Sequence, residues 1–315
     1  MGKYPALAVL CLCQIIGLPE RTLEKQPITL TFVGDVMLAR NVGRQMLKHG
    51  IDYPFEKVTA ELKNSNITFG NLEGCLVGDK VTGSSKAFVF RSPPHFGQAL
   101  RNAGFHVMSL ANNHALDGGR QGVASTIETL EQLAITPVGA GRNRQAARQL
   151  KILTAEGWRV GFLAYTDVQN IKGSAATDKL AGVATVEPIH EMVGDIKQAR
   201  DQVDLLVVSF HWGVEYQIGK PNARQVMIAT KAKAAGARIV IGHHPHVLQN
   251  LEIDKERNIV AYSLGNFVFD NHRESRARTV IMQMRVEPNG RNTIQLLACK
   301  IVQCQPRRVS SKPAQ

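Results

Sequence analysis

Short apolar runs alternate with amphipathic stretches of helical length along most of the chain. The strands that these runs predict cover residues 28–35, 66–74, 105–114, 136–141, 158–167, 204–213 and 238–246. Helices are predicted over a stretch that ends near residue 64, with a turn at 50–54, and over 94–103, 120–133, 188–202 and 222–235. Two hairpin-like strands, the second at 258–270, and strands at 278–286 and 293–303 complete the pattern. Alternating strands and helices favour an α/β fold whose sheet is covered on both faces, and the terminal hairpins favour a mixed sheet.

Polar side chains that are able to bind a metal ion follow the apolar run in five of the predicted strands. In chain order they are Asp35, then Asn71 and Glu73, then Asn112, Asn113, His114 and Asp117, then His211, and then His244 and His246. Open α/β sheets bind their ligands at the carboxyl ends of strands. Because a surface without a function has no reason to place such residues at one strand end after another, we expect these side chains to form one site.

The stretch GHHPHVLQN at residues 242–250 supplies three histidines to this group. A proline disfavours helical backbone at the residue before it, so His244 and His246 are expected to project to the same side of an extended turn around Pro245. His243 is expected to point away from them, toward the loop or the substrate. The pair on one side is predicted to hold a metal ion.

The chemistry of these residues favours one or two divalent ions. The predicted ligands are Asp35, Glu73, Asn113, His211, His244 and His246. Carboxylate, amide and imidazole donors suit manganese, iron or zinc, and the lack of thiolates argues against a closed structural zinc site. Two ions about 3.5–4 Å apart are able to clamp a phosphoryl group, which predicts a hydrolase.

A histidine and an aspartate are the predicted catalytic pair. His114 lies three residues before Asp117, whose carboxylate is expected to orient the imidazole. The imidazole is then expected to protonate the leaving group or to stabilise the transition state.

Three further residues are expected to contact the substrate. Arg91 is a candidate for binding an anionic group, because guanidinium pairs with carboxylate or phosphate, and a surface salt bridge is the alternative. Trp212 and Glu215 follow the predicted ligand His211 and are expected to shape the pocket. A place in the core is the alternative for Trp212.

The charge of the chain adds a preference for anionic partners. Its 315 residues include 38 Lys and Arg against 26 Asp and Glu, a net charge of +12. This balance favours nucleic acid, anionic lipid, an anionic polymer or a phosphorylated substrate, although the basic residues are scattered as on an ordinary solvated surface. The sequence has no zinc-finger, leucine-zipper or RNA-binding aromatic motif, so no specific nucleic-acid binding is expected. It also lacks P-loop, Rossmann and G-x-S-x-G motifs.

The composition of the ends predicts the domain organisation. An apolar run from residue 5 to about 18 is shorter than the ~20 residues of a membrane span and matches the core of a secretory signal. We therefore expect residues 1–27 to be an export segment, with a buried first helix as the alternative. Residues 28–305 are expected to form the metal-binding domain and 306–315 a basic tail. The five cysteines include no C-x-x-C pair and predict no disulfide framework.

Seven motifs give the chain a family resemblance. They are GDVMLAR, GNLEG, FRSPPHF, SLANNHALDGG, HWGVEY, GHHPHV and YSLGNFVFD, in this order between residues 30 and 270. The chain resembles the CapA family, bacterial proteins of capsule and poly-γ-glutamate synthesis. That family is similar in turn to calcineurin-like metallophosphoesterases, which implies a four-layer α-β-β-α sandwich with mixed sheets and a two-metal site at the strand ends.

The resemblance also matches individual residues of this chain to the motifs of the metallophosphoesterases. It matches Asp35 to the first-motif aspartate, Asn113 and His114 to the third motif, His211 to the fourth, and His244 and His246 to the fifth.

Two positions depart from the phosphoesterase pattern. The first motif of those enzymes is D-x-H, whereas Met37 places a thioether where an imidazole would stand, and thioether is a poor ligand for hard ions. The second motif offers Asn71 or Glu73 in place of the bridging aspartate, and we prefer Glu73 because a bridging ligand should carry charge. The first ion is therefore expected to bind weakly or not at all.

The resemblance implies a metal-dependent enzyme that acts on an anionic cell-surface polymer such as poly-γ-glutamate. It implies action at the cell envelope, exported or membrane-associated, beside a membrane complex for polymer synthesis and export. The reaction is expected to be phosphoester hydrolysis or amide-bond chemistry. The alternative is a non-catalytic polymer-binding or export accessory with a degenerate metal site, which Met37 favours and the pair His114 and Asp117 opposes. A nucleic-acid phosphodiesterase agrees with the charge but lacks a binding module.

Overall fold

The computed structural model describes residues 24–78, 88–169, 173–270 and 273–309. Apart from residues 24–27, the expected export segment lies outside this described part, as does the end of the expected basic tail. Within these ranges, no helix has both the length and the apolar character that crossing a membrane requires.

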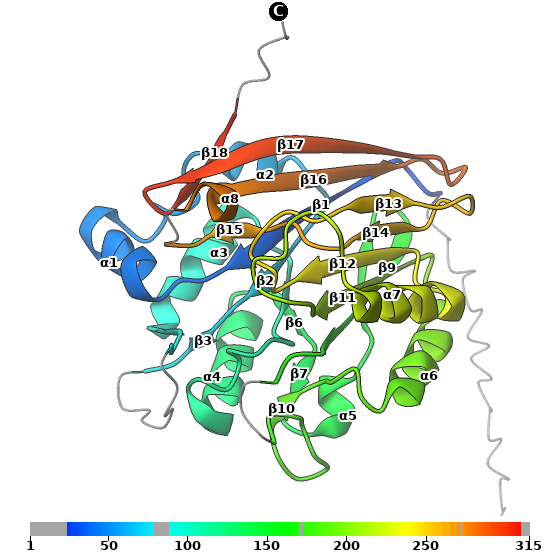
Figure 1. The fold of residues 1–315 in the computed structure, drawn as a ribbon, viewed down its shortest axis with the longest axis horizontal. Coiled ribbons are helices and arrows are strands. Elements are labelled where there is room, and N and C mark those ends of the chain that lie inside the picture. Colours follow the sequence, from blue (N-terminus) through cyan, green and yellow to red (C-terminus); the bar gives the residue numbers. More distant parts are fainter. Residues whose placement is uncertain (1–23, 79–87, 170–172, 271–272, 310–315) are drawn as a thin grey trace, which may run out of the picture.

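Two large mixed sheets form the centre of the molecule (Figure 1). The strands of the first sheet, in spatial order, are β18 (Gln305–Arg308), β17 (Asn292–Val302), β16 (Arg278–Val286), β1 (Ile28–Val36), β2 (Ile67–Leu72), β5 (Val107–Ser109) and β6 (Thr136–Val138). Strand β15 (Asn266–Val268) also pairs with β1, in parallel. Strands β1, β2, β5 and β6 run parallel, so their carboxyl ends share one edge of the sheet.

The second sheet has six strands, four of them parallel. In spatial order they are β13 (Leu251–Ile253), β14 (Ile259–Ala261), β12 (Ile239–His243), β11 (Leu205–His211), β9 (Trp158–Thr166) and β8 (Lys151–Ala155). Strands β14, β12, β11 and β9 are parallel. Two small sheets pair β3 (Cys75–Leu76) with β4 (Arg91–Ser92) and β7 (Ala140–Gly141) with β10 (Gly182–Val183).

Helices cover the outer faces of both sheets (Figure 1). On the first sheet these are α1 (Arg40–His49), α2 (Thr59–Lys63), α3 (Gly97–Ala103) and α4 (Gly119–Gln132), and on the second α6 (Ile189–Arg200) and α7 (Ala223–Ala235). Three shorter helices are η1 (Pro94–Phe96), α5 (Arg144–Ala147) and α8 (Glu274–Ala277). A capping box between Asn222 and Gln225 starts α7.

Three hydrophobic cores establish the order of the layers. One core packs α1, α3 and α4 on the first sheet and includes Val42, Leu100 and Leu130. A second lies between the sheets and includes Phe69 and Phe162, whose rings stack with centroids 5.9 Å apart. The third packs α6 and α7 on the second sheet. The four-layer α-β-β-α sandwich implied by the resemblance is confirmed.

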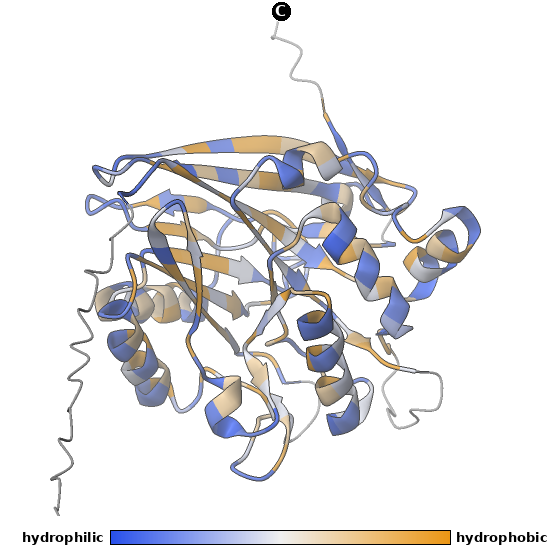
Figure 2. Cartoon of the chain, turned by 180° about the vertical axis from the view of Figure 1, so that it is seen from behind, coloured by the Kyte–Doolittle hydropathy of each residue, from blue (hydrophilic) through white to orange (hydrophobic). Residues whose placement is uncertain are grey.

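Burial explains why the central strands read as unbroken apolar runs. Every residue of β2, β11 and β12 is buried, because these strands have a core on both faces. The outer strand β17 instead alternates between buried and exposed positions along much of its length. The colouring of Figure 2 shows the same contrast, with hydrophobic residues along the inner strands and many hydrophilic ones on the covering helices.

The prediction of one strand over residues 258–270 is wrong. The segment contains β14 in the second sheet and β15 in the first, so the chain crosses between the sheets there. Gly265, at φ 71°, allows the turn, and its carbonyl accepts a hydrogen bond from the Asp35 backbone N–H at 3.0 Å. The sequence also missed α5, β8 and β10, and β18 includes the first residues of the expected tail.

Candidate metal centre

The predicted ligands from both sheets meet in one buried site. None of Asp35, Glu73, Asn113, His211, His244 and His246 has more than 7% of its surface exposed. Ligand atoms of Asp35, Glu73 and His211 lie within 4.8 Å of one another. Since Asp35 lies at the end of β1 and His211 ends β11, the strand ends of the two sheets converge as the sequence predicted.

Asp35 is surrounded by donors from β2 and from the turn that contains the histidines 243, 244 and 246. Its Oδ1 accepts a hydrogen bond from Asn71 Nδ2 at 2.9 Å and lies 3.3 Å from His243 Nδ1. Its Oδ2 lies 3.5 Å from His246 Nδ1 and accepts a hydrogen bond from the His244 backbone N–H at 3.3 Å. Burial opposes ionisation, but the hydrogen bonds and charges of His243 and His246 hold the pKa of Asp35 well below its usual value. Asp35 is therefore a carboxylate at neutral pH.

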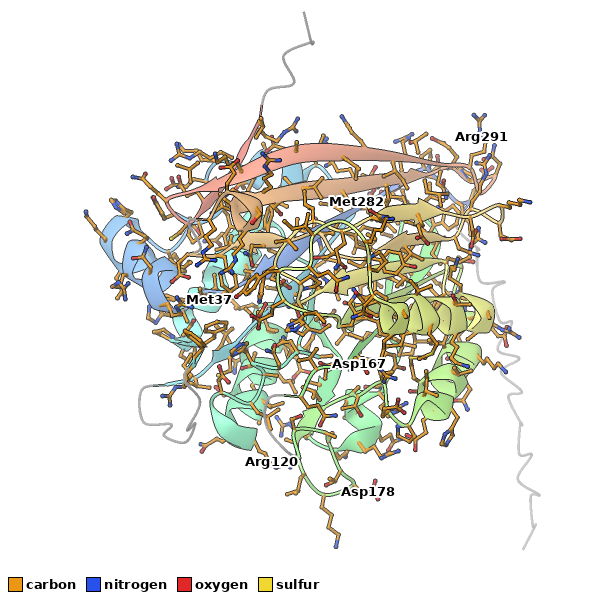
Figure 3. All side chains as sticks on the ribbon, in the orientation of Figure 1. Met37, Arg120, Asp167, Asp178, Met282 and Arg291 are labelled. Carbon is orange, nitrogen blue, oxygen red and sulfur yellow. The ribbon has the colours of Figure 1, made fainter. Side chains whose placement is uncertain are left out.

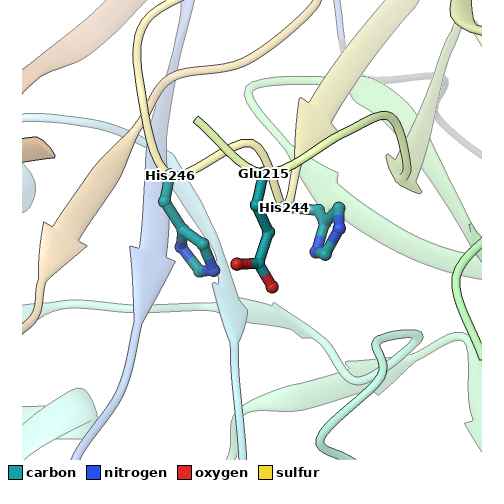
Figure 4. Close-up of side chains that lie close together, drawn as sticks. All are labelled: Glu215, His244 and His246. Atoms are coloured by element: carbon teal, nitrogen blue, oxygen red, sulfur yellow. The ribbon is translucent and has the colours of Figure 1, made fainter. Parts of the chain in front are cut away.

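His243 does not point away from the site, which corrects our expectation. Its ring is buried against Asp35, whereas we expected it to face the loop or the substrate. The backbone of the turn also differs from the extended conformation that we predicted, because His244 has φ 95° and His246 has φ 57°. The imidazoles of His244 and His246 nevertheless face the same space, with centroids 5.9 Å apart (Figure 4).

Glu73 lies between an imidazole that follows the first sheet and one that follows the second. Its Oε1 is 3.5 Å from His246 Nε2 and 3.9 Å from His114 Nε2. Burial raises the pKa of Glu73 to about 8, against the attraction of His246. Burial works the other way on His246, but the charge of Glu73 and the hydrogen bond to Asp35 raise its pKa to about 9. The site thus holds a carboxyl and an imidazole that both keep protons at neutral pH, and a cation would have to displace these protons.

Neutral imidazoles form the other half of the site. His211 Nε2 lies 2.8 Å from Asn113 Oδ1, and the rings of His211 and His244 are 4.8 Å apart. Burial lowers the pKa of His211 well below its usual value and that of His244 to about 4. Both rings are therefore neutral at physiological pH, which is the form that binds metals.

His114 is oriented as the sequence predicted. Its Nδ1 lies 2.7 Å from Asp117 Oδ2, which also accepts a hydrogen bond from the Phe90 backbone N–H at 2.6 Å. The ring stacks on Phe90 with centroids 3.9 Å apart. Because Nδ1 is held by Asp117, Nε2 is directed toward Glu73.

Unpartnered buried atoms test whether the site fits a metal ion. Neither carboxylate oxygen of Glu73 has a hydrogen-bond partner in the described ranges, and the same holds for His244 Nδ1. Leaving such groups buried without a partner costs on the order of 1–3 kcal/mol each. A divalent cation would satisfy these atoms, and carboxylate, amide and imidazole donors without thiolate suit manganese, iron or zinc. The residues fit the ion.

Met37 belongs to the core. Its side chain is wholly buried among residues that pack α1 on the first sheet, and its sulfur accepts a hydrogen bond from the Ala39 backbone N–H at 3.1 Å. Figure 3 places Met37 on the α1 side of the molecule. The position two residues after Asp35, where the phosphoesterase pattern has an imidazole, thus contributes to packing in this chain.

A cavity of about 540 Å³ opens beside His114 and His246. Its other lining residues are Arg40, Phe88, Phe90, Glu215, Tyr216, Phe269, Asp270, Arg273 and Arg276. Arg40 forms an ion pair with Asp270 at 3.2 Å, and the Arg276 guanidinium lies 3.2 Å from the centroid of the Tyr216 ring. The lining thus combines imidazole, guanidinium and aromatic side chains. A larger cavity of about 690 Å³, between α5 and α6, does not include the strand ends.

The three predicted substrate contacts have different positions. Glu215 lines the cavity, with a carboxylate oxygen within 4.8 Å of ligand atoms of His244 and His246. Arg91 lies exposed on β4 and is not among the residues that line the cavity. Trp212 is wholly buried and stacks on Phe210 with centroids 4.8 Å apart, so the core alternative holds and its role as a substrate contact is withdrawn.

Sequence reasoning missed the three arginines of the cavity. Arg40 stands at the end of the GDVMLAR motif, so its place after a strand end was a usable signal. Arg273 and Arg276 follow β15, and only the pairing of Asp35 with Asn266 brings that segment to the site. Asn266 itself lies 2.9 Å from His246 Nδ1 through its Oδ1, so it orients this histidine.

Comparison with known proteins matches nearly the whole described chain. The family model described as bacterial capsule synthesis protein PGA_cap matches residues 29–271. The capsule biosynthesis protein CapA of Bacillus anthracis is 35% identical over 300 residues, which cover 93% of this chain and 72% of that protein. The PGA biosynthesis protein CapA of Bacillus subtilis (strain 168) is 31% identical over 291 residues, covering 92% and 76%.

Among solved structures, a hypothetical protein from Thermus thermophilus has a similar fold. The TM-score is 0.54 at 14% identity, over 87% of this chain and 100% of that chain. At this identity the likeness concerns the fold alone.

Proposed function

The chain belongs to the bacterial capsule synthesis protein family PGA_cap, and from this premise we propose that it is a metal-dependent hydrolase of an anionic cell-envelope polymer. Its relatives are CapA proteins named for capsule and PGA biosynthesis. Poly-γ-glutamate or a phosphorylated substrate is the proposed target. We place its action at the cell envelope, exported or membrane-associated, beside a membrane complex for polymer synthesis and export.

The observation that carries this proposal is the buried Glu73 carboxylate facing imidazoles from both sheets without a hydrogen-bond partner in the described ranges. Asp35, Glu73 and His211 would hold one ion, since their ligand atoms lie within 4.8 Å of one another. His244 and His246 would hold a second ion, and Glu73 borders both groups because its Oε1 lies 3.5 Å from His246 Nε2. Asn113, whose Oδ1 lies 2.8 Å from His211 Nε2, would be a further donor to the first ion. When bound, divalent ions would supply Lewis-acid activation of the substrate and of water.

The residues around the ligands account for the other needs of hydrolysis. Asp117 fixes His114 so that its Nε2 is available to give a proton to a leaving group at the cavity. Arg40, Arg273 and Arg276 would bind the anionic groups of the substrate. The aromatic side chains of the cavity would pack against the apolar parts of the substrate.

Phosphoester hydrolysis and amide-bond hydrolysis both agree with this arrangement. The alternative, a non-catalytic polymer-binding or export accessory, is favoured by the burial of Met37 in the core, which removes one donor from the usual ligand pattern. The ordered pair of His114 and Asp117 favours hydrolysis, because binding alone does not need an oriented proton donor.

The test is hydrolysis by the full-length protein after removal of metal and resupply of manganese, iron or zinc. Chromogenic phosphomonoester and phosphodiester substrates and poly-γ-glutamate would be followed separately. We expect metal-dependent cleavage of at least one of them, lost in Glu73→Gln and kept in the exposed-histidine control His190→Ala. Metal-dependent binding of the polymer without cleavage would support the accessory alternative instead.

A further inference from the structure

The metal centre lacks a donor from the segment that follows Asp35. The Met37 sulfur lies in the core and accepts a hydrogen bond from Ala39, so β1 brings a single side-chain ligand, Asp35, to the site. Of the predicted ligands, His244, His246 and the shared Glu73 leave the second ion with two imidazoles and one carboxylate. Ions of this class commonly take more protein or water ligands than three.

Glu215 lies where a further donor would complete this set. It comes from the loop after β11, and one of its carboxylate oxygens lies within 4.8 Å of ligand atoms of His244 and His246. The carboxylate points into the space between the two imidazoles (Figure 4). His244 is 5% exposed, and its Nδ1 has no hydrogen-bond partner in the described ranges, so this buried imidazole beside Glu215 lacks a partner that a metal ion would supply.

The backbone holds Glu215 in this place. The Tyr216 N–H donates a hydrogen bond to the Pro245 carbonyl at 2.7 Å, which joins the β11 loop to the histidine turn. The Trp212 N–H donates to the His243 carbonyl at 3.1 Å on the other side of Glu215. Gly213, at φ 85°, makes the bend between these two bonds. The position of Glu215 is therefore fixed by the same turn that positions the histidines.

The charge of the cavity favours Glu215 as a metal ligand over Glu215 as a contact of the substrate. The cavity carries three arginines that would receive an anionic substrate, and a carboxylate in its wall would repel that substrate. A carboxylate that neutralises a bound cation has no such cost. An exposed acid is often merely solvated, but a solvated acid needs no backbone bonds that aim it at two imidazoles.

We propose that Glu215 is a ligand of the metal centre and supplies, from the β11 loop, a donor that Met37 does not supply from β1. This inference rests on the proposed metal-dependent function. It revises the sequence-based expectation that Glu215 contacts the substrate.

The experiment counts and titrates bound Mn²⁺ in the full-length protein by electron paramagnetic resonance and calorimetry. The variants are Glu215→Gln, Glu215→Asp and the control Glu131→Gln, which removes one exposed charge on α4. Each is measured at about 0.05 M and about 0.5 M salt, because salt screens long-range charge effects but not a ligand bond. Far-UV circular dichroism of the metal-free variants confirms that they are folded.

We expect Glu215→Gln to weaken one Mn²⁺ site by about 100-fold or more at both salt concentrations, and Glu131→Gln to match the wild type. Glu215→Asp keeps the charge but shortens the side chain, so it should also bind more weakly than the wild type. Wild-type affinity in Glu215→Gln, a defect that vanishes at high salt, or wild-type affinity in Glu215→Asp would overturn the proposal. If the wild type binds no ion, the proposed function fails as well, which distinguishes the two failures.

Discussion

At the scale of single residues, the Glu73 carboxyl and the His246 imidazole control the protonation of the site. Their pKa values are raised to about 8 and about 9, the first by burial and the second mainly by the charge of Glu73 against the effect of burial. A metal ion needs both groups without their protons.

Metal affinity should therefore increase with pH. Below about pH 8, binding has to displace at least one proton from Glu73 or His246, so affinity should fall by about tenfold per pH unit for each proton displaced. Calorimetry of Mn²⁺ binding at about pH 6.5 and 8.5, in two buffers of different ionisation enthalpy, measures both the affinity and the protons released. An affinity that does not change over this range would show that these two groups are not ligands.

The proposed proton donor, His114, gives a second prediction at the scale of single residues. Replacing His114 by Ala should lower the hydrolysis rate by about 10²–10⁴-fold. Asp117→Asn should cause a smaller loss, since it removes the acceptor that orients the ring but keeps the imidazole. Steady-state kinetics with metal content measured in parallel is the check. A loss of activity that simply follows a loss of metal would assign these residues to metal binding.

At the scale of elements, two close approaches between strands shape the site. A Cβ on Gly242 would collide with the Tyr262 carbonyl oxygen, which accepts a hydrogen bond from Trp212 Nε1 at 2.9 Å. This glycine precedes His243 directly, so the histidine turn depends on it. Gly34 is under a similar constraint from the Gly265 carbonyl.

Gly242→Ala should therefore destabilise the protein by about 1–3 kcal/mol. The matched control is Gly194→Ala in α6, where an added Cβ meets no atom within 4 Å and helix propensity should add about 0.5–1 kcal/mol of stability. Denaturant unfolding of the metal-free variants measures both changes. Equal effects at the two positions would mean that the close approach at β12 is not important for stability.

The helices and strands also show how much of the fold could be predicted from the sequence. Periodicity located the long strands, and the ends of those strands located the ligands, because parallel strands place their ends together. Periodicity did not show that residues 258–270 divide between two sheets, since Gly265 changes the direction of the chain without interrupting the apolar run. The positive φ values of His244 and His246 were equally hidden, because the proline rule predicts an extended residue before Pro245.

The contacts of the cavity lay beyond sequence reasoning for a different reason. Arg40 and Arg276 are separated by most of the chain and share a cavity only because β1 and β15 pair. Trp212 looked like a pocket residue by its place next to His211, but its side chain lies in the core that packs α6 and α7 on the second sheet, where it stacks on Phe210.

At the scale of the whole molecule, the net charge of +12 and the arginines of the cavity agree on an anionic ligand. Binding of poly-γ-glutamate should weaken as salt rises from about 0.05 M to about 0.5 M, because salt screens the attraction. Arg276→Gln should weaken binding by about 10–100-fold, corresponding to a lost charged hydrogen bond. Arg291→Gln, in the turn between β16 and β17 and not among the residues that line the cavity, is the charge-matched control. Fluorescence titration measures these affinities, and equal losses in the two variants would contradict a specific role of the cavity.

The metal content of the purified full-length protein tests the central claim most directly. Elemental mass spectrometry after exposure to manganese, iron and zinc would compare the wild type with the double variant His244→Ala, His246→Ala. The control is His95→Ala, His190→Ala, which removes two exposed imidazoles. The account predicts about one to two ions per chain in the wild type and the control, and loss of metal together with hydrolysis in the site variant. A wild type without metal, or equal metal in all three proteins, would contradict it.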